Sequence, residues 1–304
     1  MRLLYIAGAG RSGTTFLSLV LSQHPDTQNV GQIRDLHQAV AESDVCSCGR
    51  LVFDCPYWRP VRTRLEAEFG KGALDDLARD ALTFRQAAKA SADWASPAYR
   101  NRIATEQASF LTRLGRLYVL SSEQADGRML IDSSKSLDLV FALSLIPEIS
   151  LKILNLVRDP RAVAVSWGKK MKNTEKLRRR TAVWANRQLA ASVLQKHAPA
   201  DFMLLRYEDL TEAPRDRIGD IQDWAGLPRD LSSFTSASDT AVSWDRAHLF
   251  RPANETVLKE HRTAMTIKSA ESWRAPHNAA LHAMAEELCF PVAETLGYVK
   301  AAAS

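Results

Sequence analysis

A glycine-rich loop near the start of the chain contains the first residues that could do chemistry. Residues 8–15 read GAGRSGTT, which is the G-x4-G spacing of a phosphate-binding loop. Glycines let successive backbone N–H groups converge on an anion. A helix beginning at Thr14 or Thr15 would add the partial positive charge of its N-terminus. The loop therefore predicts a site for a phosphate or a similar anion.

Thr14 stands where nucleotide-hydrolysing loops carry a lysine. That lysine reaches the β- and γ-phosphates, and the next hydroxyl residue holds magnesium. Without it a bound triphosphate loses its main countercharge. This weakens the reading of the chain as a P-loop small-molecule kinase, which stays open as an alternative. A non-catalytic nucleotide-binding protein is the other alternative.

A second group of anion-binding residues lies further along the chain. Arg158 follows an apolar stretch, and a helix is expected to begin at Pro160. Ser166 and Lys170 are spaced i,i+4, so we expect them to share one face of that helix. An arginine at the carboxyl end of a strand faces the crevice where open α/β sheets bind ligands. A guanidinium, a hydroxyl and an ammonium could then converge on one phosphate.

The two motifs, in this order, resemble those of the sulfotransferases that use 3′-phosphoadenosine-5′-phosphosulfate (PAPS), close to the carbohydrate and tyrosyl-protein branches. The resemblance implies PAPS as co-substrate, with no metal required. It also implies that Arg158 and Ser166 bind the 3′-phosphate. The 5′-phosphosulfate would be held by the residues of the R-S-G-T-T motif, which are Arg11, Ser12, Gly13, Thr14 and Thr15.

Two weaker matches extend the resemblance. Residues 206–210 read RYEDL, like a recurrent segment of the family whose tyrosine, here Tyr207, contacts the nucleotide. Lys268, shortly before Trp273, is similar to a C-terminal basic residue that closes over it. The resemblance covers about two thirds of the chain, and residues 62–123 have no match in it.

Sulfuryl transfer is an in-line displacement that depends mainly on positioning and on stabilising charge. The leaving 5′-phosphate needs positive charge on the bridging oxygen as the S–O bond breaks. Lys135, just past an expected strand, stands where the family uses a lysine. Arg11 is the second candidate for this role.

The general base departs from the family pattern. Relatives carry Gly-Glu shortly after the first helix, and their glutamate serves as the base, whereas here Gln32 follows Gly31. An amide cannot take a proton at neutral pH. Asp35 or His37 could replace it, with His37 favoured because its ordinary pKa is nearest neutrality. Otherwise the acceptor is an amine or an acidic phenol that needs little help, or the protein binds PAPS and transfers poorly.

The elements that must position these residues follow an α/β rhythm. Short apolar stretches alternate with helical ones, which predicts a parallel sheet covered by helices on both faces, in a P-loop-like fold. We expect one sulfotransferase domain over residues 1–304, with a helical insertion at about 62–123 on the acceptor side. A last helix is expected over 278–296. The expected strands are residues 3–7, 129–132, 151–157 and 202–206.

Overall charge indicates little about partners. The chain has 40 Lys+Arg against 35 Asp+Glu, a net charge of +5. Nine basic residues fall within residues 161–187; they form a solvated helix face or a docking strip for an anionic small-molecule or glycan acceptor. No recognised nucleic-acid-binding module accompanies them, which argues against nucleic acid. Neither a secretory signal nor an apolar run of about 18 residues is found, so a cytoplasmic enzyme without a membrane span is expected.

Three cysteines cluster at Cys46, Cys48 and Cys55. Zinc sites usually show C-x-x-C pairs and four ligands. Here the spacing is C-x-C-x6-C, and the remaining cysteine, Cys289, is far away in sequence. The sequence therefore predicts a buried structural cluster and no metal site.

Overall fold

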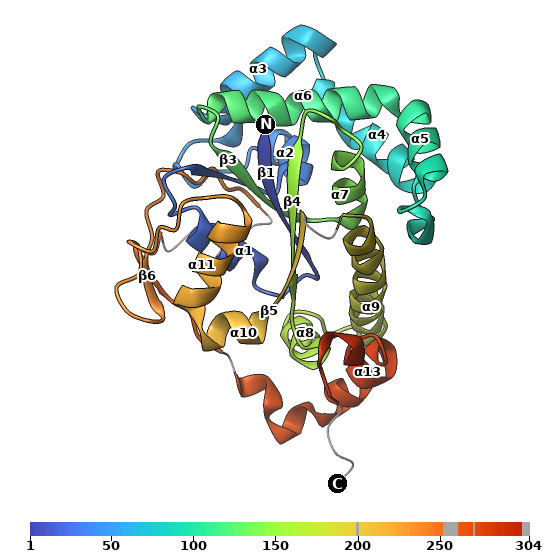
Figure 1. Cartoon of the computed structure of the whole chain (residues 1–304), viewed down its shortest axis with the longest axis vertical. Helices are drawn as coiled ribbons and strands as arrows, with labels where there is room; N and C mark the ends of the chain where they lie inside the picture. The colour runs from blue at the N-terminus through green and yellow to red at the C-terminus, as the bar shows by residue number, and fades with distance from the viewer. Residues whose placement is uncertain (199–200, 252–260, 270, 300–304) are drawn as a thin grey trace.

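A five-stranded parallel sheet forms the centre of the computed structural model, which describes residues 1–198, 201–251, 261–269 and 271–299 (Figure 1). The strand order is β2-β3-β1-β4-β5, so the first strand lies in the middle. The strands are β1 (Arg2–Gly8), β2 (Thr27–Gly31), β3 (Met129–Lys135), β4 (Ser150–Val157) and β5 (Phe202–Arg206).

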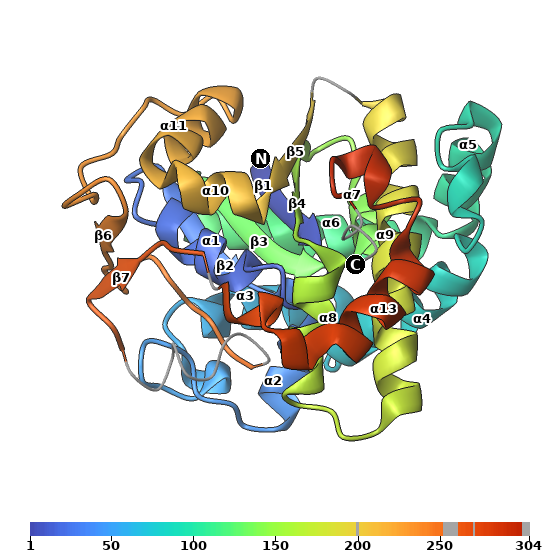
Figure 2. The ribbon, with the colours of Figure 1, turned by 90° about the horizontal axis from the view of Figure 1, so that it is seen from below.

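Helices cover both faces of this sheet because side chains alternate along each strand. In β1, Leu4 and Ile6 belong to one buried cluster, and Leu3 and Tyr5 to another. The first cluster includes residues of α1 (Thr14–Leu21) and α11 (Pro214–Trp224), near the short α10 (Tyr207–Glu212) (Figure 2). The second includes residues of α2 (Leu36–Ala41), α7 (Leu137–Leu143) and α9 (Thr174–His197). This confirms the α/β fold expected from the sequence.

Residues 62–123 are helical, as expected. They lie within α3 (Trp58–Phe69), α4 (Ala73–Ala87), η3 (Ser91–Asp93), α5 (Pro97–Glu106) and α6 (Ala108–Gln124). Figure 1 shows α6 crossing near the N-terminus of β1, while α8 (Pro160–Gly168) lies at the opposite end of the sheet. The placement of this insertion on the acceptor side stays a prediction.

Four of the five strands were expected from the sequence, and β3 runs to Lys135, three residues beyond its expected end. The helix predicted over 278–296 is α13 (Ala279–Cys289), followed by the 3₁₀ turn η7 (Glu294–Leu296). Strand β2 was not expected, because it is polar yet fully buried.

The C-terminal third of the chain, from about residue 203, has little regular structure after α11 apart from α13 and short elements. β6 (Asp239–Ala241) and β7 (Ala264–Thr266) form a two-stranded antiparallel pair. The remaining 3₁₀ turns are η1 (Ile33–Asp35), η2 (Val52–Asp54), η5 (Glu271–Arg274) and η6 (Pro276–Asn278). Among the described residues, no helix is both long and apolar enough to cross a membrane.

Candidate cofactor and transfer site

The glycine loop connects β1 to α1 and depends on glycine at two positions. Gly8 has φ +142°, and a Cβ there would lie 2.5 Å from the backbone oxygen of Leu156. Gly13 has φ +93° and lies against the ring of Tyr207, which a Cβ would approach to 2.9 Å. Larger residues would strain the backbone and push the loop away from its neighbours. The loop is thus held tightly at the carboxyl end of the sheet.

A cleft of about 500 Å³ opens beside this loop. It brings together segments that are distant in sequence, as expected for ligand sites at the carboxyl ends of parallel strands. Its lining residues that the sequence predicted are Arg11, Gly13, Thr14, Thr15, Lys135, Arg158, Ser166, Tyr207 and Lys268. None of the lining residues comes from residues 62–123.

Arg11 and Arg158 join the two predicted halves of the site. Arg11 Nε donates a hydrogen bond to Ser166 Oγ at 2.9 Å, and Arg158 Nη1 donates to the backbone oxygen of Arg11 at 3.2 Å. The Arg158 guanidinium also lies 4.4 Å from the ring centroid of Tyr207. The 5′ and 3′ motifs therefore form one continuous surface.

This surface has the groups that a nucleotide with two anionic ends requires. Neither Arg11 nor Arg158 forms an ion pair with a carboxylate in the described part of the chain. Burial and the neighbouring charge of Arg158 lower the pKa of Arg11. Ser12 is fully buried in the loop, and its Oγ has no hydrogen-bond partner among the described residues. Unpaired cations and an unsatisfied hydroxyl at a helix N-terminus fit an anionic ligand such as PAPS.

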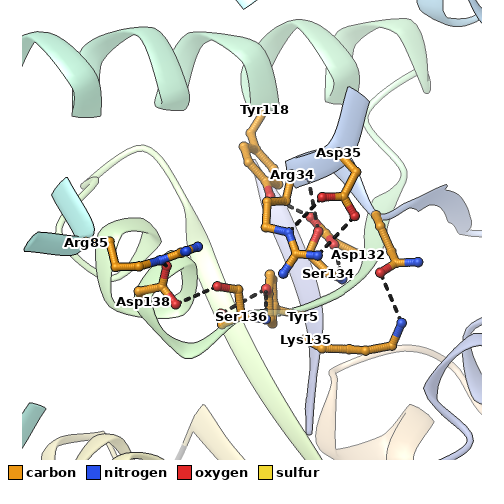
Figure 3. Close-up of polar contacts among 11 residues, drawn as sticks. Tyr5, Arg34, Asp35, Arg85, Tyr118, Asp132, Ser134, Lys135, Ser136 and Asp138 are labelled. Atoms are coloured by element: carbon orange, nitrogen blue, oxygen red, sulfur yellow. Dashed lines mark hydrogen bonds and ion pairs between the residues drawn. The ribbon is translucent and has the colours of Figure 1, made fainter. Parts of the chain in front are cut away.

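Lys135 ends β3 and reaches the same cleft. It has φ +65°, a left-handed conformation that is uncommon for a residue with a side chain. Its Nζ donates a hydrogen bond to Gln32 Oε1 at 3.0 Å (Figure 3). Burial, and then the charge of Arg34, lower the pKa of Lys135 to about 8 despite the opposing effect of Asp35. The ammonium is therefore held at the cleft by a neutral amide and without a salt bridge among the described residues.

A buried hydrogen-bond network fixes the strand end that carries Lys135 (Figure 3). Tyr118 of α6 donates to Asp132 Oδ2 at 2.5 Å, and the backbone N–H of Ser134 donates to Asp132 Oδ1 at 2.6 Å. Burial raises the pKa of Asp132 to about 6. Beyond Lys135, Tyr5 accepts from the backbone N–H of Ser136 at 2.9 Å. The network holds the strained backbone on both sides of the lysine.

The two candidates for the missing base lie in different surroundings. Asp35 forms a bidentate ion pair with Arg34, at 2.9 and 3.0 Å, and its charge acts on Lys135 (Figure 3). His37 instead lines a separate, mainly apolar pocket with Leu74 and Leu77 of the helical insertion. Neither Asp35 nor His37 lines the cofactor cleft, so the choice between them as the base stays a prediction. Gln32 Nε2 is buried with no partner among the described residues.

Lys170 is also not where it was expected. Helix α8 ends at Gly168, so Lys170 lies in the turn beyond it and does not share a helix face with Ser166. Its side chain is exposed and does not line the cleft. The i,i+4 reasoning was wrong because the helix stops two residues too early.

Three arginines of the basic segment 161–187 are held in ion pairs. Arg161 pairs with Asp159 and Glu286, and Arg178 pairs with Glu287. Arg179 pairs with Glu175. The four lysines of the segment are exposed, so a docking strip for an anionic acceptor stays a prediction.

Sequence reasoning missed several residues at the cleft. Gly10, Phe16, Trp167, Arg262, Met265 and Thr266 also line it. Trp167 directly follows Ser166, so its position was available from the motif. The last three lie in the irregular C-terminal third, where no periodicity points to a site. Arg187 of α9 was also missed, although it donates to the backbone oxygen of Gly8 at 2.8 Å.

Comparisons with known proteins agree with this site. The sequence model of the sulfotransferase family matches residues 4–231. The chain belongs to the sulfotransferase family. This confirms the resemblance read from the two motifs.

Individual relatives are more distant. Human carbohydrate sulfotransferase 1 is 27% identical over 178 residues, which is 51% of this chain and 41% of the relative. The mouse protein of the same name is 24% identical over 174 residues, 50% of this chain and 40% of the relative. The chain thus spans about two fifths of the length of these curated relatives.

Solved structures support the sulfotransferase fold. The sulfotransferase domain from the Synechococcus PCC 7002 olefin synthase has a TM-score of 0.54 at 22% identity, covering 98% of this chain and 95% of that one. The sulfotransferase domain from the curacin biosynthetic pathway has a TM-score of 0.53 at 16% identity, covering 98% of both.

Proposed function

We propose that this protein transfers the sulfuryl group of PAPS to a hydroxyl or amine of a carbohydrate, lipid or other small metabolite. The observation that carries the proposal is the single cleft that joins Arg11, Lys135 and Arg158. Two unpaired guanidiniums suit the two anionic ends of PAPS, and the loop offers amides and hydroxyls in place of a Walker lysine. The likeness of this chain to carbohydrate sulfotransferases makes a glycan the favoured acceptor in this proposal.

The residues have separate roles in this reaction. The loop residues Ser12 to Thr15 hold the 5′-phosphosulfate, while Arg158 and Ser166 hold the 3′-phosphate. Lys135 donates a hydrogen bond to the bridging oxygen as negative charge develops on the leaving phosphate. Tyr207 packs beside the nucleotide and Lys268 lies at its edge. The resemblance to PAPS-dependent sulfotransferases implies that these steps require no metal.

The acceptor proton is the open step. Asp35 is the nearer candidate base, but its ion pair with Arg34 must loosen for it to take a proton. An amine or acidic phenol would need no such help. We propose a cytoplasmic location on the sequence alone.

Transfer can be tested directly. The purified protein, PAPS and a panel of sugars, phenols, amines and lipids would be followed by mass spectrometry for products that gain one SO₃ group. Lys135→Ala should lower the rate by about 10²-fold or more, typical of losing one preorganised electrostatic group. A product that forms equally fast with Lys135→Ala, or only with ATP present, would contradict the proposal.

A further inference from the structure

The three clustered cysteines meet a histidine that lies about two hundred residues later in the chain. Cys46, Cys48 and Cys55 follow β2 and α2, while His248 belongs to the C-terminal third. One ligand atom from each residue lies within 4.8 Å of all the others. None of the four residues lines the cleft described above. This cluster is therefore a separate feature of the molecule.

The distances between these atoms are those of ligands around one small ion. Cys55 Sγ lies 3.6 Å from Cys46 Sγ and 3.7 Å from Cys48 Sγ. His248 Nδ1 lies 3.3 Å from Cys55 Sγ and 3.7 Å from Cys46 Sγ. Tetrahedral zinc with Zn–S of about 2.3 Å and Zn–N of about 2.0 Å requires S···S of about 3.8 Å and S···N of about 3.6 Å. A disulfide needs S–S of about 2.05 Å, which no pair here approaches.

The backbone is arranged around the sulfurs as well. The backbone N–H groups of Cys48, Arg50 and Trp58 lie near the sulfurs of Cys46, Cys48 and Cys55, respectively. The turn closes with a hydrogen bond from the Gly49 N–H to the Cys46 oxygen at 2.8 Å. Amide donors of this kind stabilise thiolates bound to a metal.

The histidine is held with its Nδ1 toward the sulfurs. Its ring stacks on Tyr57, with centroids 4.8 Å apart and planes 12° from parallel. Its backbone oxygen accepts from Trp58 Nε1 at 3.0 Å, and its N–H donates to the Asn29 oxygen at 3.1 Å. The imidazole is therefore fixed by its surroundings and not merely near the cysteines.

We propose that Cys46, Cys48, Cys55 and His248 form a structural Cys₃His zinc site. Sulfur and imidazole ligands in a tetrahedron select zinc over magnesium or calcium. Four protein ligands leave no open position for a substrate, so the site is structural and not catalytic. The sequence did not predict a metal site because the fourth ligand, His248, is distant in sequence from the cysteines. The spacing of the cysteines could not indicate it.

The site would tie the C-terminal third to the sheet. Residues 246–248 hydrogen-bond to Asn29 of β2, and Leu249 packs on Gly31, immediately before Gln32. The same third of the chain supplies Arg262 and Lys268 to the cleft. Zinc would thus hold together two segments that contribute to the transfer site without itself taking part in the reaction.

Metal content of the full chain tests the site independently of activity. Protein expressed with zinc supplied and dialysed should contain about one zinc per chain by plasma mass spectrometry. A mercurial that titrates the thiols should release that zinc in step with the cluster. Cobalt substitution should give the visible bands of tetrahedral coordination and a near-ultraviolet thiolate charge-transfer band. Removing the metal with a chelator should lower Tm.

Matched variants locate the metal. Cys48→Ser, at the exposed ligand, and His248→Asn should lose zinc to a chelator concentration that leaves the wild type loaded. Cys289→Ser, at the buried cysteine outside the cluster, and His277→Asn, at an exposed histidine, should keep it. The wild-type measurement stands even where a variant fails to fold. Three results would overturn the zinc site. The wild type could be metal-free and give no cobalt spectrum, it could bind iron in place of zinc, or both ligand variants could keep their zinc.

Discussion

In the proposed reaction Lys135 is the residue on which catalysis depends most, and its hydrogen-bond partner is the neutral amide of Gln32. A carboxylate at position 32 would hold the lysine protonated, whereas Gln32 accepts its hydrogen bond without adding negative charge. Burial and the charge of Arg34 then keep its pKa at about 8. The lysine can donate a hydrogen bond to the leaving group only when it is protonated. We therefore expect transfer to be fastest at pH values below this pKa.

The first prediction follows from that sign. For the free enzyme, kcat/KM should fall as pH rises through about 8, where Lys135 loses its proton. Gln32→Glu places a carboxylate about 3 Å from the ammonium, which raises the lysine pKa and moves the fall to higher pH. Gln38→Glu, on the exposed side of α2, adds the same charge and should leave the profile unchanged. The pH profile of Gln32→Glu could also stay in place while its turnover on a hydroxyl acceptor rises strongly. That result would show that position 32 is the place of a general base that this chain has lost.

In the proposed complex Arg158 binds the 3′-phosphate of the nucleotide and not its 5′ end. Arg158→Ala should weaken binding of 3′-phosphoadenosine-5′-phosphate by about 1.5–3 kcal/mol for each charged hydrogen bond lost. Binding of adenosine-5′-phosphosulfate, which lacks the 3′-phosphate, should change little. Calorimetry with both ligands measures the difference, and Lys169→Ala, an exposed charge beyond the cleft, serves as the control. Equal losses for the two ligands would show that Arg158 supports the loop and not the 3′-phosphate.

At the scale of elements, the helical insertion (residues 62–123) supports the segment on either side of Lys135. Tyr118 of α6 reaches Asp132 beneath the end of β3, and Arg85 of α4 reaches Asp138 just beyond Lys135. The insertion contributes no residue to the cofactor cleft. Its contacts act on the strand end and so on where Lys135 points.

Tyr118→Phe tests this bracing. At pH 7.5 it removes a donor to a buried carboxylate and should lower the free energy of unfolding by about 1.5–3 kcal/mol. The loss should be smaller below about pH 6, where Asp132 is protonated. Turnover should fall while affinity for 3′-phosphoadenosine-5′-phosphate stays the same, because the loop and Arg158 are untouched. Tyr99→Phe removes a partly buried hydroxyl of α5 that donates to the Ala87 oxygen, away from the end of β3, and it should spare turnover. Equal turnover in both variants would contradict the bracing role.

Local patterns were enough to predict most elements and both cofactor motifs. Four strands are apolar runs, and residues 11–15 and 158–166 carry their own spacing. Strand β2 was not predicted because Thr27, Gln28 and Asn29 are buried polar residues and the strand they pair with, β3, is distant in sequence. The surroundings of His37 could not be predicted for a related reason. Its side-chain direction depends on how α2 packs against α4, which no local pattern contains.

At the scale of the whole molecule, the cleft is assembled by the fold and not by any one segment. The loop, the end of β3, the segment from Arg158 to the last turn of α8 and the C-terminal third meet only at the carboxyl edge of the sheet. A nucleotide that bridges them would hold the C-terminal third against the sheet. The cleft carries several positive side chains, while Thr14 stands in the place of the Walker lysine in the loop. The account therefore requires a preference for a bisphosphorylated nucleotide over a triphosphate.

That preference is the most direct test of the central claim. Isothermal calorimetry should show that 3′-phosphoadenosine-5′-phosphate binds at least about tenfold more tightly than ATP, a difference of about 1.4 kcal/mol or more. Magnesium should not change this order, because Thr14 replaces the lysine that a magnesium triphosphate needs. ATP binding that is tighter and depends on magnesium would contradict the assignment of the cleft to PAPS.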